Sequence, residues 1–186
     1  MDLDLKNKQW KEFFIKDIFK EIQRGKRLKK GDHKKGNKPY VSSTSQNNGI
    51  DGFIGNENSV RVFSKTLTIA NSGSVGATFF HPYTFIASDH VTKLANDEFS
   101  MHVYTFIAGV AKRLGGKYSF NREINDERIR REKILLPIDS QGNPDYAFME
   151  AYMKDVEQKM LGKYKQFISK RLLDLNNLMG GGNKSY

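Results

Sequence analysis

Short apolar runs separated by polar turn residues fill the middle of the chain. Val60–Phe63, Thr66–Ala70 and Ala77–Phe80 are rich in β-branched and aromatic residues, at lengths typical of strands. Asn71–Ser74 is expected to form the turn between the second and third of these strands. A further pair of strand pieces is expected within Phe85–Leu94.

Three more segments carry core residues. Residues 8–23 mix aromatic and charged positions and predict a short strand followed by a helical turn. Met101–Leu114 predicts a buried helix that ends at Gly115–Gly116, and Ile134–Pro137 predicts a short buried strand that proline stops. The pattern favours an α/β (α+β) fold, with a mixed, twisted β-sheet in a domain over residues 1–144.

The last fifth of the chain has helical periodicity. Asp145 is a plausible N-cap for a helix over residues 145–179, about 50 Å long at ~1.5 Å per residue. Its apolar positions begin with 4-3-4 spacing and continue mostly in steps of four: Met149, Met153, Val156, Met160, Tyr164, Ile168, Leu172 and Leu175. A small domain cannot bury so long a seam, so we expect it to pack on another chain. The alternative is a helix that breaks at Gly162 and folds back. Residues 180–186 are expected to be a disordered tail.

The net positive charge of the chain suggests a polyanion as a candidate ligand. The chain of 186 residues has 31 Lys and Arg against 21 Asp and Glu, a net charge of +10. Such a charge attracts a polyanion, because each neutralised phosphate releases counterions, although solubility alone is the simpler interpretation. The absence of cysteine excludes disulfides and thiolate metal sites. No apolar run approaches the ~20 residues of a membrane span, and the N-terminus lacks a signal-peptide core. We therefore expect a soluble, cytoplasmic protein without a membrane partner.

Two neighbouring segments sharpen the nucleic-acid hypothesis. Between Arg24 and Lys38, glycines interrupt any helical period, which predicts an exposed basic loop with eight phosphate-binding candidates: Arg24, Lys26, Arg27, Lys29, Lys30, Lys34, Lys35 and Lys38. The polar turn that follows offers donors and acceptors suited to base edges: Ser43, Thr44, Gln46, Asn47 and Asn48. A second basic cluster spans Lys112–Lys133, from which Lys117 and Arg122 are candidate DNA contacts.

Catalysis finds little support in the sequence. Gly73–Gly76 lacks the Gly-Lys-Ser/Thr ending of a phosphate loop and predicts a tight turn. Asn143–Tyr146 only superficially resembles the Asn-Pro-Pro-Tyr site of aminomethyltransferases, because Asp145 replaces the second proline. The four histidines share no ligand spacing, and adjacent residues such as Ser88–His90 point to opposite faces of a strand. We expect no catalytic residue, no metal site and no cofactor of the chain's own.

An ordered series of segments carries a family resemblance. The segments are Phe14–Phe19, Arg24–Arg27, Pro39–Thr44, Asn47–Gly52, Thr68–Gly76, Ala87–Val91, Ile134–Pro137, Gly142–Tyr146 and Met149–Glu150. Together they cover about residues 10–155, and the chain resembles the DNA target-recognition domain of type I restriction–modification specificity subunits.

The resemblance implies an α/β recognition domain followed by a long helix. It further implies two such units in a complete subunit, with antiparallel helices that space two half-sites on double-stranded DNA. Methyltransferase subunits would dock there with S-adenosylmethionine, and a restriction/translocase subunit with ATP and Mg²⁺ would join them.

This chain holds one unit, so we expect a half-subunit that pairs as a homodimer, or a fragment. The alternatives are a recognition domain from a fused restriction–methylation enzyme, a small Mg²⁺-dependent nuclease and a structural protein that uses the helix alone. The nuclease hypothesis lacks paired carboxylates, and the structural one leaves the basic loop unexplained.

Overall fold

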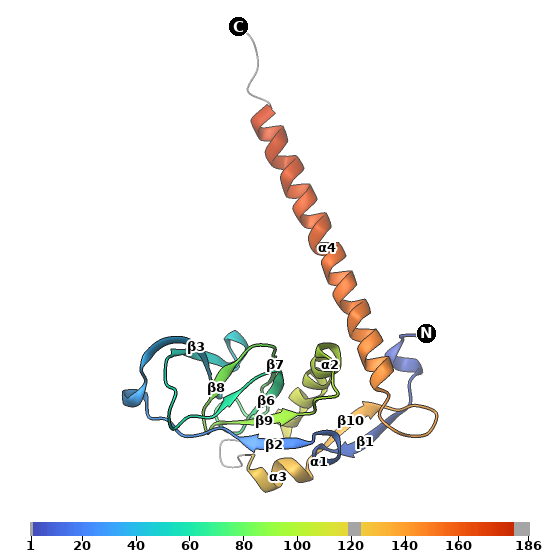
Figure 1. Ribbon diagram of the computed structural model, residues 1–186. Helices are drawn as coiled ribbons and strands as arrows, with labels where there is room; N and C mark the ends of the chain where they lie inside the picture. Colours follow the sequence, from blue (N-terminus) through green and yellow to red (C-terminus); the bar gives the residue numbers. More distant parts are fainter. Residues whose placement is uncertain (1, 119–123, 181–186) are drawn as a thin grey trace.

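The computed structural model describes residues 2–118 and 124–180. An α/β body holds all of the strands, and one long helix, α4 (Tyr146–Gly180), projects away from it (Figure 1). The strands form a two-stranded, antiparallel sheet and two four-stranded sheets. The α+β class with a long C-terminal helix is confirmed, although the strands divide among three sheets where we expected one.

The first four-stranded sheet is antiparallel throughout. Its order is β2 (Glu21–Arg24), β9 (Val91–Ala95), β6 (Thr66–Ala70) and β7 (Thr78–His81). All five residues of β6 are buried, because Leu67 and Ile69 face the main core while Thr68 on the opposite face bonds to His81. Because β6 is buried on both faces, its sequence is a continuous run of β-branched and apolar residues without polar alternation.

The second four-stranded sheet is mixed and carries the candidate ligand-binding segments. Its order is β4 (Ile50–Ile54), β3 (Lys35–Val41), β8 (Phe85–Ala87) and β5 (Val62–Phe63), and β3 pairs with β8 in parallel. One small core lies on each face. Val41, Phe63 and Phe85 belong to the first, and Tyr40, Ile54 and Ile86 to the second.

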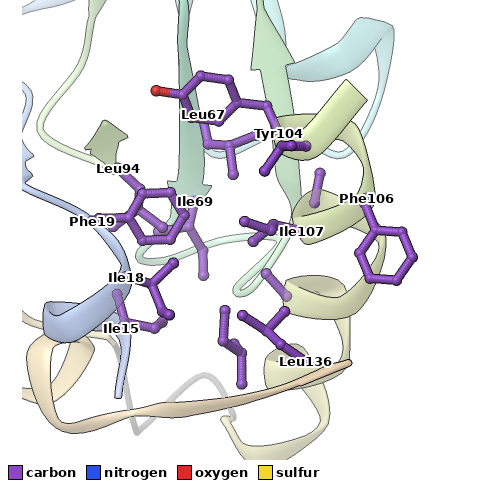
Figure 2. Close-up of a cluster of buried hydrophobic side chains, with 14 of the residues drawn as sticks. Ile15, Ile18, Phe19, Leu67, Ile69, Leu94, Tyr104, Phe106, Ile107 and Leu136 are labelled. Atoms are coloured by element: carbon purple, nitrogen blue, oxygen red, sulfur yellow. The ribbon is translucent and has the colours of Figure 1, made fainter. Parts of the chain in front are cut away.

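The main core lies between the antiparallel sheet and helix α2 (Met101–Ala111). Figure 2 shows Leu67 and Ile69 of β6 facing Ile107 of α2, with Ile15 and Ile18 of the short helix α1 (Ile15–Ile18) closing one end. The two-stranded sheet, β1 (Trp10–Phe14) with β10 (Lys133–Pro137), adds Leu136 to the same core. Burial of these side chains is the main stabilising term of the body.

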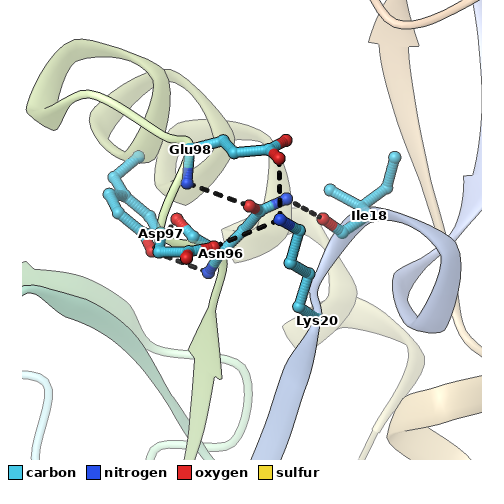
Figure 3. Close-up of polar contacts among 6 residues, drawn as sticks. Ile18, Lys20, Asn96, Asp97 and Glu98 are labelled. Carbon is cyan, nitrogen blue, oxygen red and sulfur yellow. Dashed lines mark hydrogen bonds and ion pairs between the residues drawn. The ribbon is translucent and has the colours of Figure 1, made fainter.

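Short helical pieces complete the body. They are the 3₁₀ turns η1 (Leu5–Asn7), η2 (Lys30–Asp32), η3 (Asn47–Gly49) and η4 (Lys112–Lys117), and the helix α3 (Asp126–Arg131). A cluster of polar contacts joins α1 to the loop before α2. Asn96 donates to the carbonyl of Ile18 at 3.0 Å, and Lys20 forms ion pairs with Asp97 and Glu98 (Figure 3).

Helix α4 begins in the core and ends outside it. Asp145 caps its N-terminus by accepting from the backbone N–H of Phe148 at 2.8 Å, and Lys8 pairs with the same carboxylate at 2.6 Å. Burial opposes ionisation of Asp145, but these two bonds outweigh it and lower the pKa of that carboxyl. Phe148 and Met149 are buried in the main core. The helix runs on through Gly162 without a break, so the fold-back alternative is wrong.

Several sequence predictions need correction. Lys35 and Lys38 lie in β3, and Lys30 lies in η2, so the expected basic loop is partly regular structure. The predicted helix over Met101–Leu114 ends at Ala111 and continues as a 3₁₀ turn. Strand β4 and helix α3 were not predicted. The expected tail beyond residue 180 lies outside the described residues.

Candidate nucleic-acid interface

The basic segment, residues 24–38, is anchored by its backbone and by one apolar side chain. The N–H groups of Gly25 and Lys26 donate to the carbonyls of Val91 and Ala87 at 2.9 and 3.0 Å. A side chain at Gly25 would collide with backbone, because a Cβ there would lie 2.0 Å from the carbonyl oxygen of Ser88. Leu28 packs on the small core of Tyr40, Ile54 and Ile86. Carbonyl groups of β8 and β9, one strand from each four-stranded sheet, therefore determine where this segment begins.

A buried asparagine holds the far end of the basic segment. The side chain of Asn56 accepts from the N–H of Lys34 at 2.8 Å and donates to the carbonyl of Asp32 at 2.9 Å. With both ends fixed through backbone groups, the long side chains remain free to reach solvent. The exposed ones are Lys26, Arg27, Lys29, Lys30, Lys34 and Lys35. Six cations on one anchored segment form a surface suited to phosphate contact.

Arg24 and Lys38 differ from the other six candidates. The Nε of Arg24 donates to the carbonyl of Asp89, and the carbonyl of Arg24 accepts from Arg61. Arg24 is thus tied into the backbone of the turn after β8, and part of its guanidinium is not available to DNA. Lys38 lies half-buried in β3. Both residues thus support the segment, and their assignment as phosphate contacts stays a prediction.

The polar turn, residues 42–49, has an unusual backbone. Asn47, Asn48 and Gly49 all have positive φ, at 47°, 53° and 82°. This left-handed conformation suits asparagine and glycine and disfavours other residues. The turn is closed by Ser42 N–H donating to Gly49 and by Gly49 N–H donating to Gln46, both at 2.9 Å. As a result the side chains of Gln46, Asn47 and Asn48 are exposed, while Ser43 and Thr44 are half-buried.

A second loop, residues 71–77, lies against the polar turn. The N–H of Ser74 donates to the carbonyl of Ser43 at 3.0 Å. Buried Asn71 organises the loop, because its side chain accepts from Thr92 at 2.8 Å and donates to the carbonyl of Asp89 at 3.3 Å. Gly73 and Gly76 have positive φ, as a tight turn requires, so the expectation of a turn here is confirmed.

Two hollows flank the polar turn. The first, of about 260 Å³, is lined by Leu28, Lys30, His33, Tyr40, Ser42, Asp51 and His90. The second, of about 520 Å³, lies between the 71–77 loop and η4 and includes Ser45, Ser74, Lys112 and Tyr118 in its lining. Lys30 and Ser42 line the same hollow, so the basic segment and the polar turn form one continuous surface. Sequence reasoning missed Ser74 and His90, and it placed Lys112 in the second basic cluster without linking it to the polar turn; only the fold brings these residues together.

The second basic cluster is less uniform than the sequence suggested. Lys117 forms an ion pair with Glu132 at 3.5 Å, and Arg130 donates to the carbonyl of Ile22 at 3.1 Å. Lys117 also lines a separate depression beside β10, away from the polar turn. Lys117 lines neither of the two hollows beside the polar turn, and its assignment as a DNA contact stays a prediction. Arg122 lies outside the described residues.

The histidines do not form a catalytic arrangement with their serine and aspartate neighbours. Ser88 Oγ interacts with the hydroxyl of Ser42, while His90 Nδ1 bonds to Ser72 at 2.7 Å. The Nε2 of His90 lies 3.9 Å from Asp89, too far for the hydrogen bond that orients a catalytic base. His81 is buried between Thr68 and Tyr83, and burial lowers its pKa to about 4. Across residues 2–118 and 124–180, no three histidine or acidic side chains gather to hold a metal ion.

Helix α4 carries the other candidate interface. Met149 is fully buried in its own domain, which corrects its assignment to a partner seam. Met153 and Val156 line an apolar groove of about 480 Å³ between α2 and α4, together with Met160 and Tyr164. Beyond the body the exposed apolar side chains continue to the end of the helix: Met160, Leu161, Tyr164, Phe167, Ile168, Leu172, Leu173, Leu175 and Leu178. In the part of the chain that the structure describes, no helix is long and apolar enough to cross a membrane.

Known proteins share both the sequence pattern and the fold. Residues 7–165 match the family described as type I restriction modification DNA specificity domain. A relative from Heyndrickxia coagulans, the specificity subunit of the type II restriction enzyme BcgI, is 38% identical over 161 residues, which are 86% of this chain and 47% of the relative. This chain thus spans about half the length of that relative.

Solved structures agree on the fold. The S subunit of a type I restriction–modification system from M. genitalium aligns with 95% of this chain and 46% of its own, at a TM-score of 0.59 and 19% identity. The HsdS subunit from Thermoanaerobacter tengcongensis aligns with 86% of this chain and 40% of its own, at a TM-score of 0.57 and 13% identity. The match over residues 7–165, most of the chain, establishes the family. The chain belongs to the family of type I restriction–modification DNA specificity domains.

Proposed function

We propose that this chain is the recognition part of a non-catalytic, sequence-specific DNA-binding subunit. It would direct methyltransferase and restriction subunits to a gapped target. The observation that carries the proposal is the continuous surface on which Lys30 of the basic segment and Ser42 of the polar turn line one hollow. Cations position a duplex through its phosphates, and exposed amides read base edges, so the two segments supply complementary parts of recognition.

In this proposal the chemistry belongs to other subunits. S-adenosylmethionine, ATP and Mg²⁺ would be bound by the methyltransferase and the restriction/translocase partners. The test is to incubate the purified chain with duplex DNA and Mg²⁺, with and without S-adenosylmethionine. We expect binding without cleavage or methyl transfer. Nuclease or methyltransferase activity that co-purifies with the chain and persists in the absence of any partner would contradict the proposal and favour the small-enzyme alternative.

We further propose that α4 pairs with a second copy. The helix has 35 residues, and its outer two-thirds carry an apolar stripe with nothing to cover it among the described residues. An antiparallel pair about a two-fold axis would cover the stripe with the same surface from each copy, and it would place the two recognition surfaces at opposite ends. The DNA target would then be a gapped palindrome.

The stripe is also wide enough for the methyltransferase partner. At 100° per residue, Phe167 and Leu172 bound an arc of about 140° that holds the exposed apolar side chains listed above except Leu173, and this arc is broader than the narrow seam of a two-stranded coiled coil. Pairing of two α4 helices would leave part of this arc exposed. We assign that remainder to a helix of the methyltransferase subunit.

A second candidate assembly is favoured by one comparison. The relative that is 38% identical is named as the specificity subunit of a type II restriction enzyme. The same recognition role could therefore serve a restriction enzyme that is not of type I. Co-purification of the chain with its subunits would decide between the two assemblies. In either case the protein must reach DNA, and we place it in the cytoplasm.

A further inference from the structure

Asp51 is an acid on a surface that otherwise suits phosphate. It lies on β4, immediately after the polar turn, and its exposed side chain lines the first hollow with Lys30 and His90. Sequence reasoning did not select it, because the neighbouring amides were the more obvious base-reading groups. Its position follows from the pairing of β4 with β3 next to the anchored basic segment.

The carboxylate of Asp51 has unused bonding capacity. Within residues 2–118 and 124–180, Asp51 forms no side-chain hydrogen bond and no ion pair, although Lys30 lines the same hollow. A carboxylate that faced phosphate would be repelled, and burying it against DNA without a donor would be costly. A surface that binds DNA with Asp51 in it therefore needs a donor from the DNA.

A second polar group in the hollow also has no partner. The Nε2 of His33 is buried without a hydrogen bond among the described residues, and its ring packs edge-on against Tyr40 at a centroid distance of 4.8 Å. Buried polar atoms normally have partners, so an unmatched one marks a site that a ligand or water completes. The hollow thus holds an anionic acceptor and an unmatched ring nitrogen beside Lys30.

We propose that Asp51 is a base-reading residue whose carboxylate accepts a hydrogen bond from the exocyclic amino group of a cytosine in the major groove. This inference rests on the proposed DNA-binding function and names one specificity determinant within it. An ionised carboxylate can only accept hydrogen bonds, and the amino group of cytosine is a hydrogen-bond donor in the major groove. Thymine O4 and guanine O6 are acceptors that the same carboxylate repels. Asp51 would therefore both attract the correct base and reject these two wrong ones.

The test compares the full-length wild type with Asp51→Asn in selection from a random duplex library, followed by titration of the enriched duplex and a scrambled duplex. Asparagine keeps the shape of the side chain and removes its charge. We expect preference at one cytosine position to fall by about 5- to 150-fold. Affinity for the scrambled duplex should rise by about two- to fivefold, because a repulsive charge is gone. A purely structural role for Asp51 would not produce these opposite changes.

Two controls keep the outcomes distinct. Asp17→Asn makes the same change at an exposed site on α1 and should alter neither preference nor affinity. Asp51→Glu, which keeps the charge, should still bind scrambled DNA like the wild type. If the wild type enriches a sequence and Asp51→Asn enriches the same one with equal preference, the role of Asp51 is overturned while the DNA-binding function stands. If the wild type enriches no sequence, both fail together.

Discussion

The backbone N–H of Ser74 donates to the carbonyl of Ser43 at 3.0 Å, and this bond joins the loop after β6 to the polar turn. Gly73 permits the contact, because a Cβ at that residue would lie 2.7 Å from the hydroxyl of Ser43. The two loops thus form one unit that rests on the buried strand β6. In the proposed function, this bond would hold the polar side chains of the turn in place before DNA binds.

The polar turn should contribute specificity more than affinity. Asn47→Gly removes the amide and keeps the positive φ, whereas Asn47→Ala would add a backbone cost of about 1–2 kcal/mol. Gln46→Ala is free of that complication, since Gln46 has φ of −87°. We expect either Asn47→Gly or Gln46→Ala to lower discrimination at one base by about 1–3 kcal/mol. Competition between the enriched and scrambled duplexes measures it, and equal losses on both duplexes would show that the turn is only structural.

The basic segment should contribute affinity more than specificity. Replacing Lys29, Lys30, Lys34 and Lys35 by alanine should weaken binding to all duplexes, because each phosphate that is no longer neutralised retains its counterion on the DNA. The slope of log K against log[salt] should flatten by about 0.9 for each such phosphate. Fluorescence anisotropy titrations between low and moderate salt give this slope.

A matched variant separates the position of the lysines from net charge. Replacing four exposed lysines outside the segment lowers the charge of the chain by the same amount: Lys6, Lys11, Lys16 and Lys163. We expect this variant to keep the wild-type slope. If both variants flatten the slope equally, the attraction is a property of the net charge of +10 and the basic segment has no special place at the DNA backbone.

Pairing through α4 can be tested at its outer half. Leu172 is 56% exposed, so Leu172→Asp should not disturb the body, but it would bury a charge in the proposed helix pair and give monomers. Gln166→Asp, on the side of the helix opposite the arc between Phe167 and Leu172, should stay dimeric. Val156 is a less clean site, because it also lines the groove against α2. Sedimentation equilibrium at micromolar concentration distinguishes the cases, and a monomeric wild type would refute the pairing.

Buried His81 predicts a pH dependence of stability. Burial lowers its pKa from 6.5 to about 4, so between these values the unfolded state binds a proton that the folded state does not. The free energy of unfolding should therefore fall as the pH drops from 6.5 to 4. The fall is about 1.4 kcal/mol per pH unit where the unfolded state binds one whole proton more than the folded state, and about 3 kcal/mol in all. Urea unfolding of the wild type and His81→Gln at pH 4.5 and 7.5 measures this. His90→Gln, at an exposed histidine, should keep the full dependence, and a wild type equally stable at both pH values would contradict the assignment.

Local patterns predicted the parts of the fold that local physics controls. Thr66–Ala70 is a strand with the predicted bounds, because β-branched and apolar residues fill a position buried on both faces. Asp145 caps α4 because a carboxylate can satisfy a free N–H at the start of a helix. These signals depend on a few neighbouring residues, so they are readable without the rest of the structure.

Tertiary contacts decided the rest. The charge pattern marked Arg24 as a phosphate contact, but it could not show that Asp89 would present a carbonyl to it. The periodicity of α4 included Met149 in an outer seam, because spacing does not reveal how many turns lie on the helix's own domain. Asn71 and Asp51 gave no signal in sequence, since their roles depend on strands that meet only in the fold.

We propose that this surface distinguishes one DNA sequence from others. The most direct measurement is the ratio of the dissociation constants of the wild type for its enriched duplex and for a scrambled duplex of the same length and composition, both at about 150 mM salt. We expect a ratio of at least about 10³, the lower end for specific DNA-binding proteins. Equal dissociation constants for the two duplexes would contradict it and leave only nonspecific attraction between a basic protein and a polyanion.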